Sequence, residues 1–275
     1  MSGYLSEERH QIILETLEAR GSITVNEMVE RFGVSEMTIR RDLDALERRG
    51  LLRRVHGGAV LDRGRSYEPP FVARAIENLS AKQQIARTAA ALIENGDSII
   101  LDVGTTTYEI ARQLVDKQNL TVITPCLQIA TLLAENPNIR LILTGGIVRP
   151  TELSMVGHLA ERALRDFYVD KLFLGAAGVD LEAGLTEYNL EDTLVKQVMI
   201  KNAKRVILVA DASKFGRIAF TAIAPLSVIN TLITDEKLDL EWISRLRKLE
   251  IEVIVASEKA NEKNGILFGE EVAVR

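Results

Sequence analysis

Side chains that can recognise DNA gather between residues 35 and 43. On a helix of period 3.6, Ile39 and Leu43 fall on one face, and the arginines fall on the other face or along its border. An arginine on an exposed helix face can donate two hydrogen bonds to a guanine in the major groove. The alternative is an ordinary amphipathic helix with a solvated arginine face. We predict a DNA recognition helix whose contacts come from Ser35, Glu36, Met37, Thr38, Arg40 and Arg41.

A second basic group follows in residues 51–60. Two short strands around Gly57 and Gly58 would form a β-ribbon, or wing, beside the recognition helix. Basic side chains on such a ribbon can reach phosphate groups or the minor groove. We predict that Arg53, Arg54 and His56 make these contacts.

The residues before the recognition helix predict the elements that position it. Residues 9–18 have the apolar spacing of a helix, and Thr24 and Glu27 have the spacing of a capping box that opens a second helix. Gly33 provides the turn into Ser35. We therefore predict a winged helix-turn-helix domain over residues 1–61.

Charge and composition limit where double-stranded DNA could bind. The chain of 275 residues has a net charge of −5, yet residues 1–65 contain 11 basic and 11 acidic side chains. DNA affinity would therefore come from a local arginine patch, and two such domains in a homo-oligomer would be needed for useful specificity. The single cysteine, Cys126, fits a reducing cytosol. We expect a cytoplasmic protein with no metal, no cofactor and no membrane segment.

The rest of the chain alternates between apolar runs and amphipathic segments of helical length. This alternation predicts an α/β domain with a mostly parallel, doubly wound sheet over residues 80–275. Residues 62–79 are predicted to be a linker, because they are polar and contain the pair Pro69 and Pro70. The predicted strands are 98–103, 120–124, 139–144, 169–174, 205–210, 231–234 and 251–255.

Polar side chains and glycines follow several of these strands. In parallel sheets, ligands bind beyond the carboxyl ends of the strands, where helices begin and free N–H groups can hold a phosphate. A threonine-rich helix start without a ligand is the alternative. We predict a pocket for a small anionic polyol, formed by Asp102, Gly104, Thr105, Thr106, Thr107, Gly145, Gly146, Arg149, Asp180 and Lys214.

Two sets of motifs together resemble the DeoR family of bacterial transcriptional regulators. In the first, Arg9, Ile13 and Leu17 are followed, after a gap, by Ser35 and residues 38–43. In the second half, the similarity lies in Asp102-x-Gly104-Thr105-Thr106, Gly145-Gly146, Asp170-Lys171-x-Phe173, Gly178-Val179-Asp180, Gly184-Leu185-Thr186, Lys196 and Asp211-x-Ser213-Lys214-Phe215-Gly216. The resemblance implies a sensor domain similar to ribose-5-phosphate isomerase, an oligomer, and a phosphorylated sugar effector that loosens operator binding.

Some positions depart from the family pattern. Pro125 and Cys126 stand where a polar pair is usual, Ala177 where serine is frequent, and Asp192 where glutamate is usual. These changes affect the expected sugar-reading end of the pocket and leave its phosphate end intact.

Two classes of function follow from these observations. The first is a repressor of a carbohydrate-metabolism operon; the chemistry of the residues does not distinguish it from an activator. The second is a sugar-phosphate isomerase fused to a DNA-binding domain, with Asp180 and Lys214 as acid–base candidates. The run of acidic residues usual in such isomerases is absent after Gly175. We therefore favour the regulator over the enzyme.

Overall fold

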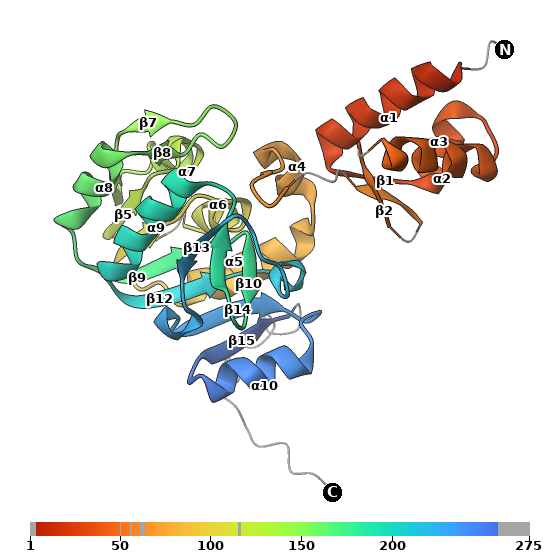
Figure 1. The fold of residues 1–275 in the computed structure, drawn as a ribbon. Helices are drawn as coiled ribbons and strands as arrows, with labels where there is room; N and C mark the ends of the chain where they lie inside the picture. Colours follow the sequence, from red (N-terminus) through yellow and green to blue (C-terminus); the bar gives the residue numbers. More distant parts are fainter. Residues whose placement is uncertain (1–3, 50, 56, 61–63, 115–116, 258–275) are drawn as a thin grey trace, which may run out of the picture. The chain divides into compact units, whose positions relative to one another are not determined.

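The computed structural model describes residues 4–49, 51–55, 57–60, 64–114 and 117–257. The chain divides into two compact units, residues 1–77 and 78–275 (Figure 1). The domain boundaries at 61 and 80 given above remain predictions. Within the described residues, no helix is long and apolar enough to cross a membrane.

Within the described part of residues 6–60, the N-terminal unit forms three helices and a small antiparallel sheet with strand order β1-β3-β2. This arrangement confirms the predicted winged helix-turn-helix. Its elements are α1 (Ser6–Arg20), β1 (Ser22–Thr24), α2 (Val25–Phe32), α3 (Glu36–Arg48), β2 (Arg53–Val55) and β3 (Gly58–Val60).

Local sequence signals explain where these helices begin and end. Gly21 and Gly33 end α1 and α2 in the left-handed conformation, with φ of 76° and 64°. Thr24 caps α2, since its side chain accepts a hydrogen bond from the Glu27 N–H at 3.2 Å. The three helices then share one core, whose fully buried side chains are Ile13, Leu17, Met28, Ile39, Leu43 and Leu46.

A short helix, α4 (Phe71–Ile76), lies inside the segment predicted as a linker. The two prolines precede this helix and so do not interrupt it. Arg74 stabilises it by donating to the Pro69 carbonyl at 2.9 Å and to the Glu68 carboxylate at 3.0 Å. Proline is compatible with a helix start, because its fixed φ suits the first turn and its missing N–H would have no partner there.

The second unit is organised around a seven-stranded sheet with order β15-β14-β12-β9-β4-β5-β6, in which every neighbouring pair is parallel. The seven predicted apolar runs form this sheet, so the predicted fold class is confirmed. The direction of winding reverses between β4 and β9, which is where such sheets bind ligands. The strands are β4 (Ser98–Leu101), β5 (Leu120–Thr124), β6 (Ile139–Leu143), β9 (Val169–Leu174), β12 (Ala203–Val209), β14 (Thr231–Asp235) and β15 (Glu252–Ala256).

Helices cover both faces of the sheet, so its strands are apolar on both sides. On one face, Phe173 and Ile207 pack with α5 (Leu79–Ala91), α6 (Thr105–Arg112) and α7 (Leu127–Leu133). On the other, Leu172 and Leu208 pack with α8 (His158–Arg165), α9 (Leu190–Lys201) and α10 (Leu240–Lys248).

Short elements beside the main sheet were not predicted. They form the hairpin β7–β8 and a second antiparallel sheet with order β10-β11-β13. Each strand is only two to four residues long, too short for a periodic signal. These elements are β7 (Ile147–Val148), β8 (Met155–Val156), β10 (Gly178–Asp180), β11 (Gly184–Glu187) and β13 (Thr221–Ala224), with the 3-10 turns η1 (Ala212–Lys214) and η2 (Leu226–Val228).

Candidate functional site

The start of α3 presents the residues predicted to touch DNA. Ser35 caps the helix, because its Oγ accepts from the Thr38 N–H at 3.2 Å and lies 2.9 Å from the Thr38 Oγ1. Met37 is 61% exposed. Arg40 is exposed but donates to the Glu36 carboxylate at 3.0 Å. Arg41 is exposed and has no ion pair within the described part of the chain, so its donors are the most available of this group.

A buried carboxylate fixes the opposite side of α3. Asp42 accepts from Arg9 Nε at 2.7 Å and from Arg9 Nη2 at 3.1 Å, and His10 Nε2 lies 3.1 Å away. The Asp42 hydrogen bond raises the pKa of Arg9 against the opposing effect of burial. The sequence motif contained Arg9 and Asp42 without revealing their role. Their pairing ties the recognition helix to α1 and thereby orients its exposed face.

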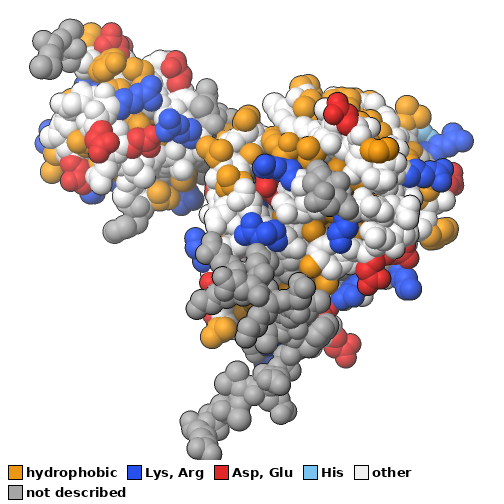
Figure 2. All heavy atoms as spheres, turned by 180° about the vertical axis from the view of Figure 1, so that it is seen from behind, with side chains coloured by type: hydrophobic (Ala, Val, Ile, Leu, Met, Phe, Trp, Pro, Cys, Tyr) orange, Lys and Arg blue, Asp and Glu red, His pale blue; other side chains and the backbone are white. Residues whose placement is uncertain are grey.

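The wing arginines differ from each other. Arg53 is exposed, as a phosphate contact requires. Arg54 is half-buried and forms an ion pair with Asp44 of α3, while its N–H donates to Glu47 at 2.7 Å. His56 lies outside the described residues. Acidic and basic side chains are interspersed on the face of this unit in Figure 2. This mixture agrees with a neutral domain that would bind DNA through a few arginines.

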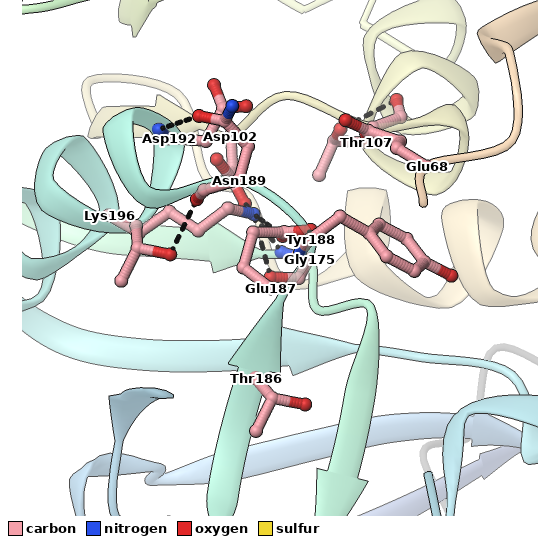
Figure 3. Close-up of polar contacts among 12 residues, drawn as sticks. Glu68, Asp102, Thr107, Gly175, Thr186, Glu187, Tyr188, Asn189, Asp192 and Lys196 are labelled. Atoms are coloured by element: carbon pink, nitrogen blue, oxygen red, sulfur yellow. Dashed lines mark hydrogen bonds and ion pairs between the residues drawn. The ribbon is translucent and has the colours of Figure 1, made fainter. Parts of the chain in front are cut away.

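In the second unit, a buried charge cluster lies at the carboxyl edge where the sheet reverses direction (Figure 3). Asp102 follows β4 and accepts from the Gly175 N–H, beyond β9, at 2.9 Å. Lys196, from α9, lies 2.5 Å from Asp102 Oδ2 and 3.0 Å from Glu187 Oε2. Lys196 also donates a hydrogen bond to the Gly175 carbonyl at 3.0 Å. We call Asp102, Glu187 and Lys196 the buried charge cluster.

The contacts within the cluster change the pKa of Asp102 and that of Lys196. Burial raises the pKa of Asp102, and the Lys196 ammonium opposes that rise. Burial by itself lowers the pKa of Lys196, but the carboxylates of Asp102 and Glu187 raise it above its ordinary value. Lys196 is therefore a permanent cation at neutral pH, and it accounts for the presence of two carboxylates in the interior.

The predicted phosphate-binding stretch begins α6, directly after the cluster residue Asp102. Thr107 donates its hydroxyl to the Gly104 carbonyl at 2.9 Å, whereas Thr106 is half-exposed and Thr105 is buried. The first N–H groups of any α-helix have no acceptor within the helix, so this end can accept an anion. Because Thr106 is the least buried of the three threonines, its hydroxyl is the one best placed to donate a hydrogen bond to such an anion.

The loop after β6 brings Arg149 to α9, where it forms an ion pair with Asp192. Asp180 and Lys214 lie in other local structures. The Asp180 carboxylate accepts from the N–H groups of Glu182 and Ala183, both at 2.9 Å, and so closes the β10–β11 turn. Lys214 is in η1, where its N–H donates to the Asp211 carbonyl at 3.1 Å. The ten predicted pocket residues thus come from several loops of this unit, and their grouping into one pocket remains a prediction.

The loop after β6 has no room for a side chain at Gly146. Its φ is 118°, and a Cβ there would lie 2.6 Å from the Val156 carbonyl oxygen. We expect Gly146→Ala to lower the free energy of unfolding by about 2 to 4 kcal/mol, through backbone strain and the clash. Gly145→Ala is the control: Gly145 also has a positive φ, 70°, but a Cβ would have no neighbour within 4 Å. Chemical denaturation should show the larger loss for Gly146→Ala; equal losses would contradict the clash.

Sequence reasoning left two members of the buried charge cluster out of the predicted pocket. Lys196 was noted only as a motif residue, and Glu187 was missed altogether. A lysine in an amphipathic helix reads as a surface residue, and nothing local distinguishes Glu187. The described residues contain no group of three or more metal-binding side chains that could hold an ion.

Comparison with known proteins gives the same assignment to both units. The family model of the DeoR-like helix-turn-helix domain matches residues 9–64, and that of the DeoR C terminal sensor domain matches residues 77–236. The HTH-type transcriptional regulator YulB of Bacillus subtilis is 42% identical over 90% of this chain and 95% of its own length. The putative aga operon transcriptional repressor of Escherichia coli O157:H7 is 36% identical over 91% and 94%. The glycerol-3-phosphate regulon repressor of Escherichia coli K12 is 35% identical over 83% and 90%.

Similarity to enzymes is weaker. A ribose 5-phosphate isomerase of Methanocaldococcus jannaschii aligns over 50% of this chain and 55% of its own, with 21% identity and a TM-score of 0.38. A similarity this low does not indicate a shared reaction. The relatives that match most of the chain are transcriptional regulators, so the isomerase alternative is not supported. The chain belongs to the DeoR family of DNA-binding transcriptional regulators.

Proposed function

We propose that this protein is a cytoplasmic repressor of a carbohydrate-metabolism operon that leaves its operator when a phosphorylated sugar binds. It acts as a homo-oligomer, a dimer or a tetramer, whose α3 helices enter two half-sites while the wings contact the backbone. The names of two relatives support this proposal. One is a repressor of the aga operon, and the other represses a regulon named for glycerol 3-phosphate, a phosphorylated polyol.

The observation that carries the effector proposal is the position of the α6 start. A helix N-terminus with three successive threonines follows Asp102 at the reversal point of the sheet. The phosphate would bind to the N–H groups and hydroxyls of Thr105–Thr107, with a positive charge from Lys214. Gly145, Gly146 and Arg149 would line the same edge. Binding there loosens DNA only if the effector prefers the arrangement of subunits that fits the operator less well.

The test couples DNA binding to effector binding in one titration. Operator fragments are first selected from genomic DNA with the purified protein, and fluorescence anisotropy then follows their release by phosphorylated sugars. We expect Thr106→Ala with Lys214→Ala to bind operator normally but to need about 10- to 100-fold more effector, because a hydroxyl and a cation are lost.

The matched control is Thr131→Ala with Lys201→Ala, which removes the same two types of side chain at exposed positions of α7 and α9. It should respond like the native chain. An unchanged response of the Thr106/Lys214 variant would refute the placement of the phosphate. Absence of release by every phosphorylated sugar would refute the effector proposal itself.

A further inference from the structure

One carboxylate oxygen of the buried charge cluster and one buried hydroxyl outside it have no hydrogen-bond partner within the described residues. The Asp102 side chain is 1% exposed, and within the described residues its Oδ1 receives no hydrogen bond. Ser154 is fully buried, and its Oγ has no partner in the same part of the chain. Buried polar atoms of native proteins are nearly always paired with protein, water or ligand.

A series of contacts connects Ser154 to the end of β4, which Asp102 follows. Ser154 forms an isolated bridge with Cys126, which follows β5. The Cys126 thiol is buried, and the carboxylates of Asp102 and Glu152 add to the effect of burial in raising its pKa. Thr124 links Cys126 to the end of β4, because its Oγ1 accepts from the Cys126 N–H at 3.1 Å and donates to the Leu101 carbonyl, next to Asp102, at 2.8 Å. This is also the region where the sequence departs from the family pattern, at Pro125 and Cys126.

The cluster has no donor left for a ligand. An ammonium has three hydrogens, and that of Lys196 already has three partners: it donates to Asp102 and to the Gly175 carbonyl and forms an ion pair with Glu187. Two carboxylates against one ammonium leave a net charge of −1, and Arg149 is already paired with Asp192. A ligand group that enters this region must supply hydrogens and must not be an anion.

We infer that Asp102 and Ser154 form hydrogen bonds with the end of the effector that is remote from its phosphate. This end of the effector carries hydroxyl or ammonium groups and no carboxylate. The inference rests on the proposed function, which puts the phosphate at the start of α6. Asp102 and Thr105 are three positions apart, at most about 10 Å of chain, so one small molecule can span both. The effector class is a polyol or amino-polyol phosphate, and aldonic acid phosphates are excluded.

Asp102 Oδ1 and Ser154 Oγ are both buried in this conformation, so the ligand reaches them only after a local movement. β8 is buried, with Met155 4% and Val156 0% exposed, so we assign this movement to the exposed strand β7. Its Ile147 is 67% exposed and its Val148 41% exposed. The Arg149–Asp192 ion pair ties the β7–β8 hairpin to α9. Segments with few buried apolar contacts are the ones that open locally.

The experiment compares matched probes by thermal shift and by isothermal titration on the full chain. The pairs are erythritol 4-phosphate with 4-phosphoerythronate, ribitol 5-phosphate with 5-phosphoribonate, and glucitol 6-phosphate with 6-phosphogluconate; glucosamine 6-phosphate is the ammonium probe. We expect each polyol phosphate that binds to do so at least about tenfold more tightly than its acid partner, because the acid places a second anion beside Asp102.

Variants test the residues separately. Ser154→Ala should weaken the best polyol phosphate about 3- to 10-fold, the value of one hydrogen bond. Asp102→Asn keeps Lys196 paired with Glu187, removes the excess negative charge, and should reduce the discrimination against the acid. Thr234→Val is the matched control: it removes another buried hydroxyl without a partner, on β14, and should leave binding unchanged.

The outcomes separate the two proposals. Equal or tighter binding of the acid partner would overturn this inference and leave the proposed function standing. Discrimination that persists unchanged in both Asp102→Asn and Ser154→Ala would also overturn it. If no phosphorylated probe, including the common aldose and ketose phosphates, binds at all, the proposed function fails and the inference with it.

Discussion

Replacing Arg41 with alanine is expected to abolish specific operator binding while leaving effector binding intact. Arg41 is exposed at the start of the recognition helix and, unlike Arg40, has no ion pair within the described residues. A bidentate arginine–guanine pair contributes about 1 to 3 kcal/mol of discrimination. In a dimer the loss of about 2 to 6 kcal/mol in total means that specific affinity should fall about 30- to 20,000-fold. Anisotropy titrations with operator and with scrambled DNA measure the effect.

Two further substitutions separate base recognition from simple charge. Arg41→Lys keeps the positive charge but not the two-donor fork, so it should retain non-specific affinity and still lose preference for the operator. Arg20→Ala is the matched control, because Arg20 is an exposed arginine of α1 paired with Glu27. Normal operator binding by Arg41→Ala would show that α3 is not the recognition helix.

Replacing Lys196 with methionine is expected to destabilise the second unit more than any other change considered for it. The substitution keeps an unbranched side chain but leaves Asp102 and Glu187 buried without a cation. Removing one partner of a buried ion pair costs about 3 to 5 kcal/mol. For a unit of this size the midpoint of thermal unfolding should fall by roughly 6 to 20 °C. Lys201→Met, at an exposed position of the same helix, is the control and should change little.

The pH dependence of this loss has a definite sign. In the native chain the folded pKa of Lys196 is raised, so its stabilisation is complete below the unfolded pKa of about 10.4 and is lost only above it. In the Lys196→Met variant, burial raises the folded pKa of Asp102 without the opposing effect of the lysine, so the folded state binds a proton more strongly and gains stability as the pH falls. The difference between native chain and variant should therefore be larger near pH 8 than near about pH 5.

A compensating substitution checks the electrostatic cause. Lys196→Met combined with Asp102→Asn and Glu187→Gln removes both uncompensated charges and should recover most of the lost stability. Failure to recover, together with a loss that is the same at both pH values, would mean that the lysine matters for packing and not for charge.

Local patterns in the sequence were sufficient for the elements of both units. The spacing of Ile39 and Leu43, the Thr24 cap and the turn at Gly33 specify the helix-turn-helix, because each signal acts within one helical turn. The seven strands of the main sheet were equally predictable, since strands buried on both faces are continuous apolar runs. The fold class also predicted that Asp102 and Thr105–Thr107 lie at the carboxyl edge of the sheet, because they directly follow a strand.

Tertiary structure alone decided which charged side chains meet. Lys196 and Asp102 are 94 positions apart, and Arg149 and Asp192 are 43 apart, so no local spacing could pair them. Arg54 was expected on DNA but lies against Asp44, a pairing set by how the wing folds back on α3. The physical reason is that the pairing of a charge depends on burial and on the partners that packing brings near, whereas a helix or strand depends on its neighbours in the chain.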